Sequence, residues 1–375
     1  MSFSPATARL LVVKIGSALI VDPLSAAPRH EWLAGVCADI ALLRAQGVQV
    51  IVVSSGAIAL ARRSLNLTQA KLRLEEKQAA ASVGQIRLAQ AWSEALSAHG
   101  LTAAQLLLTL EDTEDRRRYL NARATLRTLL AMGCIPVINE NDAVATGEIR
   151  FGDNDRLAAR VAAMVEADQL VLLSDIDGLY TADPKRDPTA AHLPVIATLS
   201  AEIDAMGGEP PPGFSSGGMR TKLIAARIAT EAGCAMAIAL GNVARPLSAM
   251  IEGARCSWFL PAAGGRSARK NWIAGSLAAL GTLTIDEGAA KALWKGSSLL
   301  PAGVHAVAGM FERGDAVDIC DQAGLRIGRG LSAYSADESR IIAGHKSEDI
   351  ETLLGWRGRD EMIHRDDLVL LAAPG

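Results

Sequence analysis

The sequence has little of several features that would assign it to other classes of protein. Aromatic residues make up only 4% of the 375 positions, whereas half of the positions are hydrophobic. A chain that is rich in Ala, Leu, Val and Gly but poor in aromatic residues fits α/β layers better than a β-sandwich. The formal net charge is only −3, so the charge balance favours neither a nucleic-acid-binding protein nor a membrane-surface protein.

Long hydrophobic runs and paired cysteines are also missing. The first apolar run is interrupted at Lys14, and no segment approaches the roughly 18 apolar residues of a membrane span. No signal peptide is visible, so we expect a cytoplasmic protein. The five cysteines are odd in number and form no CxxC pair, which favours buried, reduced thiols over a disulfide framework or a zinc site; they are Cys37, Cys134, Cys234, Cys256 and Cys320.

What the chain does contain is an alternation of short apolar runs and helix-length segments. The length of 375 residues exceeds one ordinary core, so two domains are expected. The apolar runs show no strict alternation, as in strands that are covered on both faces. The predicted strands are Leu10–Ile15, Val48–Val53, Ala104–Leu108, Cys134–Ile138, Gln169–Leu173 and Ala235–Leu240, and the predicted helices lie near 29–46, 56–65, 75–99, 115–131, 154–166 and 219–232.

This pattern predicts a three-layer α/β/α domain built on an open, mainly parallel sheet. We place this domain at residues 1–260 and a linker rich in Pro, Gly and Ala at 261–280. Residues 281–375 form a small β-rich domain, since strand-like runs and turns alternate at 283–293, 303–309, 315–321 and 326–334. Ligands of open parallel sheets bind at the carboxyl ends of the strands, so polar residues there are functional candidates.

The first two strands each end in a small-residue turn. Lys14, followed by Gly16, either reaches solvent as a strand-end lysine or forms a cation beside a backbone that can approach an anion. Ser54, Ser55 and Gly56 stand between a strand and a helix, so they provide either an N-cap or an anion site at the helix N-terminus.

A dense group of acids and amides follows the fourth strand, at residues 137–155. Asn139, Asn141 and Asp142 come directly after the apolar run and should lie at the ligand-binding edge. Asp153 or Asn154 is a natural N-cap for the next helix, but capping does not account for the whole group. Clustered carboxylates repel one another unless cations share the site.

Two later turns complete the candidate site. The segment 174–184 has two possible explanations. Either its Asp and Gly residues simply form turns, or the loop contacts the base and ribose of a nucleotide. Glycines at 217 and 218 precede a helix with Lys222 in its first turn. This arrangement is suited to binding a phosphate group, although the Walker A spacing of a P-loop is absent. GxSxG is absent too, so a serine hydrolase is not indicated. Two lysines on such turns indicate phosphoryl transfer, in which cations neutralise the moving charge.

Together these motifs resemble the glutamate 5-kinases of the amino-acid kinase superfamily. The resemblance rests on "VVKIGS", "SSGAIAL", "PVINENDAVAT", "GDNDRLAA", "SDIDGLYTADP" and "GGMRTK". It extends to the C-terminal PUA domain of the long bacterial forms through "DEGAAKAL" and "SRIIAGHKSEDIETLLG". Ser17 and the sequence "SSGGM" depart from the family's more common Thr and "GTGGM", but both changes keep a hydroxyl or a glycine-rich turn.

The resemblance implies ATP-dependent phosphorylation of the γ-carboxylate of L-glutamate, the first step of proline biosynthesis, with Mg²⁺ as cofactor. It implies that Lys14 and Lys222 act on the transferring group and that Asp155 organises them. It also implies a glutamate site and an ATP site. Glutamate would contact Ser55, Gly56, Asp142 and Asn154, and ATP would contact Lys14, Gly16, Ser174, Asp175, Ser216, Gly217, Gly218, Met219, Arg220, Thr221 and Lys222. The ligands of the metal are not assigned.

The resemblance also implies partners, and two other functions remain as alternatives. The implied partners are a second copy of the chain in a dimer or tetramer and proline as a feedback inhibitor. Because an acyl phosphate product is labile, we also expect transient contact with glutamyl phosphate reductase. One alternative is a related kinase for N-acetylglutamate or aspartate. The other is RNA binding by the PUA domain, which its charge disfavours: residues 282–375 contain ten Lys and Arg but fifteen Asp and Glu.

Overall fold

The computed structural model describes residues 3–67, 69, 72–145, 154–208, 218–262 and 279–371. The chain folds into two compact units, Met1–Gly265 and Arg266–Gly375. None of the helices within the described ranges is both long enough and apolar enough to cross a bilayer. All five cysteines are free thiols; Cys37 and Cys234 are buried, and the other three are half-buried.

The described part of the first unit is built on an eight-stranded sheet with the order β3-β4-β2-β1-β5-β9-β10-β8. Its neighbouring strands pair in parallel, except that β10 runs antiparallel to β9. The strands are β1 (Leu10–Ile15), β2 (Gln49–Ser54), β3 (Ala103–Leu108), β4 (Ile135–Glu140), β5 (Gln169–Ser174), β8 (Val195–Ile196), β9 (Ala235–Leu240) and β10 (Cys256–Phe259). The predicted mainly parallel sheet is confirmed.

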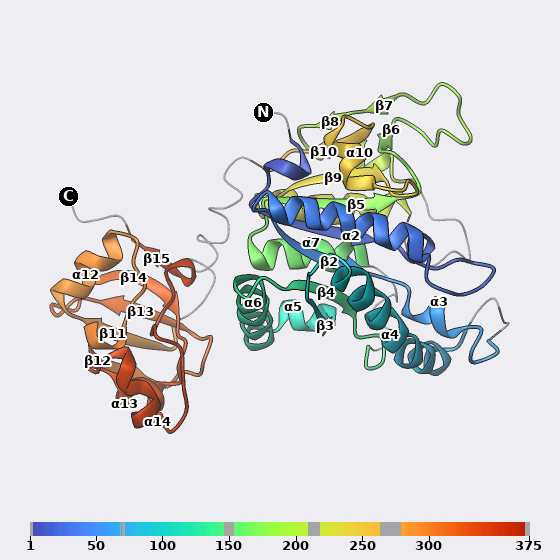
Figure 1. The fold of residues 1–375 in the computed structure, drawn as a ribbon. Coiled ribbons are helices and arrows are strands. Elements are labelled where there is room, and N and C mark those ends of the chain that lie inside the picture. Colours follow the sequence, from blue (N-terminus) through green and yellow to red (C-terminus); the bar gives the residue numbers. More distant parts are fainter. Residues whose placement is uncertain are drawn as a thin grey trace. The chain divides into compact units, whose positions relative to one another are not determined.

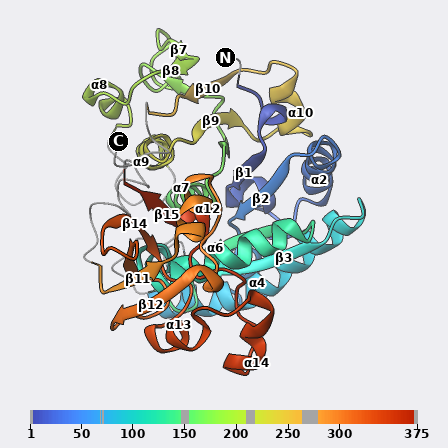
Figure 2. The same ribbon diagram turned by 90° about the vertical axis from the view of Figure 1, so that its left-hand side faces the viewer.

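Helices cover both faces of this sheet, as Figures 1 and 2 show. Alternate residues of β1 explain why both faces need cover: Leu11, Val13 and Ile15 pack into one core, and Val12 packs into the other. The first core lies under α2 (His30–Ala45), α3 (Ala57–Ala61), α4 (Leu74–Ser97) and α10 (Pro246–Ile251). The second lies under α6 (Arg116–Ala131), α7 (Asn154–Val165) and α9 (Met219–Glu231).

Shorter elements connect these layers. They are η1 (Pro5–Thr7), α1 (Ser17–Ile20), α5 (Leu110–Glu114), α8 (Ala201–Ala205) and the hairpin of β6 (Leu179–Tyr180) with β7 (His192–Leu193). The predicted helix at 56–65 is shorter than expected, because α3 ends at Ala61 and turns follow. The prediction that Asn139 follows the fourth strand was wrong: β4 continues through Asn139 and Glu140, which pair with Leu107 and Leu108 of β3.

The second unit contains a five-stranded sheet with the order β12-β11-β13-β14-β15 over the described residues. The strands are β11 (Gly281–Ile285), β12 (Val304–Gly309), β13 (Ala316–Cys320), β14 (Arg326–Leu331) and β15 (Leu368–Leu370). Helices α12 (Glu287–Trp294), α13 (Ala336–Ile342) and α14 (Ile350–Leu354) and the turns η2 (Pro301–Gly303), η3 (Ser347–Asp349) and η4 (Arg365–Asp367) surround it. The run 283–293 is strand only at its start, because Asp286 caps α12 by accepting from the Ala289 N–H.

Candidate active site

Two lysines and one aspartate meet at the carboxyl end of β1. Lys14 is the penultimate residue of β1, Asp155 lies in the first turn of α7, and Lys222 lies in the first turn of α9. Lys14 Nζ is 2.6 Å from Asp155 Oδ1, and Lys222 Nζ is 3.0 Å from Asp155 Oδ2. The three side chains are buried. One carboxylate therefore holds two ammonium groups at fixed positions.

The electrostatics of this triad keep the aspartate ionised. Burial alone would raise the pKa of Asp155, but the charges and hydrogen bonds of Lys14 and Lys222 outweigh burial and lower that pKa to about 2. Thr221 adds a further donor, since its Oγ1 lies 3.1 Å from Asp155 Oδ2. The triad carries one net positive charge at neutral pH, which suits a site for a transferring phosphoryl group.

Small residues and helix N-termini surround the two ammonium groups. Gly16 follows Lys14, and a Cβ at Gly16 would lie 3.8 Å from Lys14 Nζ, so the glycine leaves that side of the ammonium open. Gly218 caps α9 with an extended backbone. The N-termini of α7 and α9 bring the positive ends of two helix dipoles to the same region. Backbone and side chains thus combine to attract an anion.

A chain of amide hydrogen bonds begins where β2 ends. The Ser55 N–H donates to the Ile15 carbonyl, which joins the turn after β2 to the end of β1. Asn154 Nδ2 donates to Ser55 Oγ at 2.6 Å and to Asn139 Oδ1 at 3.1 Å. Gly56 follows with φ +121°, a conformation that glycine adopts without strain. The turn, the end of β4 and the start of α7 therefore form one polar wall.

Asp142 lies just after β4 and is buried. Burial and the negative charge of Glu140 raise the pKa of its carboxyl to about 7, against the opposing effect of Lys77. A carboxyl poised near neutrality gains most from a cationic ligand, because such a ligand stabilises its charged form. Asp142 is thus suited to an ammonium group, although no hydrogen bond among the described residues joins it to Ser55 or Asn154.

The predicted nucleotide residues lie in two places. Ser174 ends β5, is buried, and donates to Asp175 Oδ1 at 3.1 Å. The Asp175 side chain is 78% exposed, and its Oδ2 lies 3.8 Å from Lys185 Nζ. Gly218, Met219, Arg220, Thr221 and Lys222 begin α9, whereas Ser216 and Gly217 lie outside the described residues, as does Asp153.

Of the predicted site residues, one group that is in mutual contact consists of Lys14, Asp155, Thr221 and Lys222. A separate contact joins Ser55 and Asn154. Sequence reasoning missed the contact of Asn139 with Gln85, whose Oε1 accepts from Asn139 Nδ2 at 2.8 Å. Gln85 lies in a helix whose spacing indicated only a core or an oligomer face, so no local signal marked it. Across the described ranges, no group of three or more His, Cys, Asp or Glu side chains is placed to hold a metal ion.

Comparison with known proteins identifies the family. Residues 9–239 match the model of the amino acid kinase family, and residues 281–354 match that of the PUA domain. The chain therefore belongs to the amino acid kinase family, with a PUA domain after the kinase unit.

Full-length relatives narrow the assignment. Glutamate 5-kinase of Gluconobacter oxydans is 65% identical over 365 residues, which is 97% of each chain. Glutamate 5-kinase of Paramagnetospirillum magneticum is 60% identical over 97% of this chain and 98% of its own, and that of Paracoccus denitrificans is 59% identical over 97% of both. Within the amino acid kinase family, the chain is a member of the glutamate 5-kinases.

Proposed function

We propose that this protein transfers the γ-phosphoryl group of ATP to the γ-carboxylate of L-glutamate, giving L-glutamyl 5-phosphate for proline biosynthesis. The observation that supports the proposal most strongly is the buried triad of Lys14, Asp155 and Lys222 at the carboxyl end of β1. A γ-carboxylate with a pKa of about 4.3 is already ionised at neutral pH, so the attack needs no general base. The difficulty is the approach of one anion to another.

The two lysines address this repulsion. In the proposal, Lys14 and Lys222 bind the phosphates and the charge that develops on the moving group, while Asp155 holds their ammonium groups in place. Because both lysines are buried and already oriented, little reorganisation is needed when charge develops. Fixed cations in a site of low dielectric are worth more than the same cations in water.

The substrate pockets are assigned to either side of the triad. Ser55, Gly56, Asp142 and Asn154 bind glutamate, with the Asp142 carboxylate facing the α-ammonium group. ATP lies along the turn after β5 and the start of α9. Its proposed contacts are Lys14, Gly16, Ser174, Asp175, Gly218, Met219, Arg220, Thr221 and Lys222, together with Ser216 and Gly217 beyond the described residues.

Mg²⁺ enters this proposal as part of the substrate MgATP. In kinase sites Mg²⁺ keeps several waters and is held mainly by substrate phosphates and one or two carboxylates. Both oxygens of Asp155 are engaged by lysines, which fits a carboxylate that orients cations better than one that binds the metal directly. The protein residues therefore neutralise charge on one side of the phosphoryl group and the metal neutralises it on another.

The partners that go with this activity belong to the same proposal. Proline shares the α-carboxylate and the protonated nitrogen of glutamate, so it can compete for the pocket of Asp142 and Asn154. A homo-oligomer is part of the proposal, as is a transient contact with glutamyl phosphate reductase, which would receive the labile acyl phosphate.

Trapping of the acyl phosphate with hydroxylamine tests the proposed reaction. The protein is incubated with ATP and Mg²⁺ and, separately, with L-glutamate, L-aspartate or N-acetyl-L-glutamate. We expect hydroxamate from L-glutamate alone, because Asp142 favours a free ammonium group over the acetylated nitrogen, and because the full-length relatives are glutamate 5-kinases, which disfavours aspartate. Hydroxamate from aspartate or N-acetylglutamate instead would keep the kinase class and overturn the substrate assignment. The absence of hydroxamate from all three acids would contradict the proposed function.

A further inference from the structure

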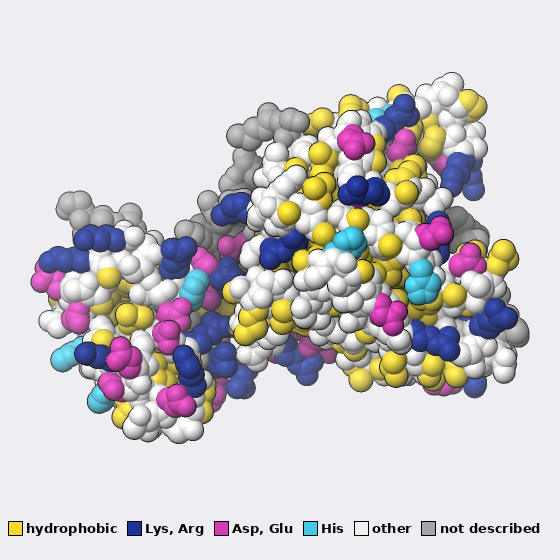
Figure 3. All heavy atoms as spheres, in the orientation of Figure 1, with side chains coloured by type: hydrophobic (Ala, Val, Ile, Leu, Met, Phe, Trp, Pro, Cys, Tyr) yellow, Lys and Arg dark blue, Asp and Glu magenta, His cyan; other side chains and the backbone are white. Residues whose placement is uncertain are grey.

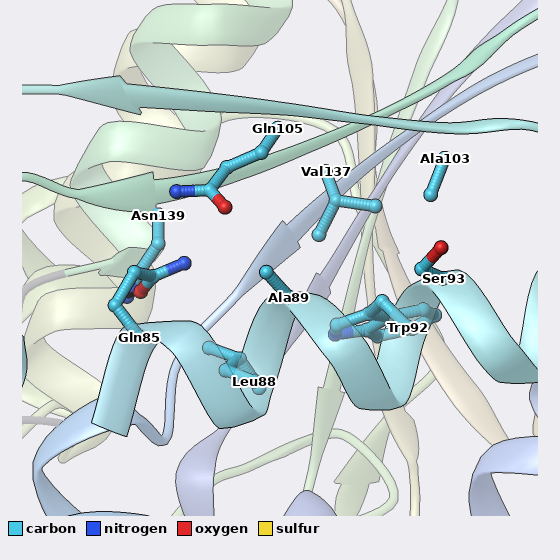
Figure 4. Close-up of a pocket in the computed structure, with 9 residues that line it drawn as sticks. All are labelled: Gln85, Leu88, Ala89, Trp92, Ser93, Ala103, Gln105, Val137 and Asn139. Carbon is cyan, nitrogen blue, oxygen red and sulfur yellow. Dashed lines mark hydrogen bonds between the residues drawn. The ribbon is translucent and has the colours of Figure 1, made fainter. Parts of the chain in front are cut away.

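Gln85 of α4 contacts Asn139, a residue of the polar wall, on the side away from Asn154. It lines a cavity of about 170 Å³ between α4 and strands β3 and β4, and in Figure 4 its side chain lies beside that of Asn139 at one end of this cavity. Asn139 Nδ2 donates to Gln85 Oε1 at 2.8 Å. Asn139 is buried and contacts Asn154 on its other side, so Gln85 is two hydrogen bonds away from the pocket.

The donors in this chain determine how each amide is oriented. The backbone N–H of Glu140 points at the Asn139 side chain at 2.9 Å and can only donate, so the atom that it meets must be Oδ1. The amide nitrogen of Asn139 is then left to face Gln85, whose Oε1 accepts from it. A flipped Asn139 would place its nitrogen against the Glu140 N–H, a pairing of donor with donor that no rotation of the Gln85 amide relieves.

The orientation of Asn139 in turn determines that of Asn154. Because Asn139 presents an oxygen, Asn154 must present its nitrogen, and the two N–H groups of Asn154 go to Asn139 Oδ1 and Ser55 Oγ. The Asn154 Oδ1 is left buried, and no donor to it is found among the described residues. Ser55 Oγ accepts from Asn154, so its own proton remains to be donated.

We propose that Gln85 and Asn139 are positioning residues: Gln85 anchors the Asn139 amide in the orientation that the Glu140 N–H sets, and Asn139 thereby commits Asn154 to act as an acceptor and Ser55 as a donor toward the bound amino acid. This inference rests on the proposed function of the pocket. It assigns one N–H of the substrate's α-ammonium group, which also faces the Asp142 carboxylate, to Asn154 Oδ1, and a carboxylate of the substrate to the Ser55 hydroxyl. An unpaired buried acceptor costs free energy until a ligand donor reaches it, so the arrangement selects an amino acid over the acid without its amino group.

Gln85→Met tests the inference, because it removes the acceptor with little change of side-chain volume. We expect the KM for L-glutamate to rise about 10-fold, which corresponds to the loss of one hydrogen bond to an oriented group. The kcat should stay within about 3-fold of the wild-type value, and the KM for ATP should not change. The ratio of kcat/KM for glutamate to that for glutarate, which lacks the ammonium group, should fall by about the same 10-fold factor. Gln85→Glu keeps an acceptor and should restore the ratio, and Gln85→Ala should repeat the effect of Gln85→Met.

Gln90→Met is the matched control, since it makes the same chemical change on the same helix, where Gln90 Nε2 donates to the exposed Glu94. It should leave every parameter within about 2-fold. The inference is overturned if Gln85→Met leaves the glutamate-to-glutarate ratio unchanged, or if it changes the kinetics of both acids and of ATP alike. If the wild-type protein prefers another amino acid, the proposed function fails on that result, and the same ratio is measured with that amino acid and its des-amino analogue.

Discussion

Asp155 is the residue that couples the two cations of the site. Its carboxylate contacts Lys14 and Lys222 with different oxygens, and its pKa of about 2 keeps it charged at any physiological pH. The two ammonium groups are therefore held in place by one charged partner. The roles of these residues lead to two predictions that concern single side chains.

Lys222→Ala should lower kcat by about 100-fold to 1000-fold, while the KM for glutamate changes by less than about 5-fold. The reason is that, in the proposed mechanism, Lys222 binds the transferring phosphoryl group most strongly when charge develops on it in the transition state and does not contact glutamate. Steady-state kinetics with both substrates varied measures the two effects. Arg227→Ala on the same helix, where Arg227 pairs with Asp204, is the control and should leave kcat unchanged. An unchanged kcat in Lys222→Ala would exclude the transition-state role.

The pKa of Asp142 predicts how substrate capture depends on pH. A carboxyl with a pKa of about 7 in the free enzyme is protonated and neutral below pH 7, where it cannot pair with an ammonium group. We expect kcat/KM for glutamate to fall about 10-fold per pH unit below 7 and to level off above it. Asp142→Asn should have a lower kcat/KM with no such dependence. A wild-type profile that is flat between pH 5.5 and 8 would contradict the assignment.

At the scale of secondary structure, the pocket depends on how closely α3 and α4 approach each other. Gly84 of α4 faces the Ala57 carbonyl of α3, and a Cβ at this glycine would lie only 1.7 Å from that oxygen. Trp92 of the same helix is fully buried, and its Nε1 donates to Ser54 Oγ at 2.9 Å. Helix α4 thus packs against the turn of Ser55 and Gly56 and supports it.

Gly84→Ala should lower the free energy of unfolding by about 1–3 kcal/mol, because the added methyl group forces the two helices apart. The displaced turn should also raise the KM for glutamate. Urea denaturation and steady-state kinetics test the two effects. Val83→Ala, at the neighbouring exposed position of α4, is the control and should change the stability by no more than about 0.5 kcal/mol. Equal stabilities of Gly84→Ala and the wild-type protein would show that the helices can separate at no cost.

Elements with a strong local pattern were predictable from the sequence, and those without one were not. The runs at 10–15, 169–173 and 235–240 are almost entirely apolar, with Lys14 and Gln169 as the exceptions, and each became a strand that pairs in parallel. The two-residue strand β8 and the antiparallel β10 were not predicted, because such short segments show no periodicity and depend on their neighbours. The contact of Gln85 with Asn139 joins residues 54 positions apart, so it follows from helix packing and has no signature in either segment.

For the candidate site, the sequence indicated which residues take part but not how they are arranged. Lys14 lies at the end of a strand, and Asp155 and Lys222 lie in the first turns of helices, where ligands of parallel sheets bind; the resemblance implied their roles. Their mutual distances could not be predicted, since three separate segments must converge. The raised pKa of Asp142 also depends on burial, which a sequence does not state.

At the scale of the whole molecule, the second unit is an acidic module. Lysine and arginine side chains on the face seen in Figure 3 are interspersed with aspartates and glutamates and form no continuous basic patch there. Several arginines of this unit pair with carboxylates; they are Arg326 and Arg329 with Asp318, Arg340 with Asp337, and Arg365 with Asp366. Arginines that are engaged in this way contribute little to binding of a phosphate backbone.

We therefore expect the full-length protein to show no salt-dependent binding of RNA. Mobility shifts with a structured RNA at about 50 mM and 200 mM salt measure this, because a backbone-binding protein loses affinity steeply over that range. A shift at low salt that disappears at high salt would assign an RNA-binding role to the second unit. The expected result leaves this unit with a structural or regulatory role.

Isotope transfer tests the central claim, that a carboxylate oxygen of glutamate attacks the γ-phosphorus of ATP. L-Glutamate labelled with ¹⁸O in its γ-carboxylate is incubated with the protein, MgATP and hydroxylamine, and the released phosphate is analysed by mass spectrometry. Attack at the γ-phosphorus breaks the bond to ADP, and hydroxylamine then cleaves the acyl–oxygen bond, so each phosphate should carry one ¹⁸O atom. Label in AMP, or phosphate without label, would contradict the mechanism.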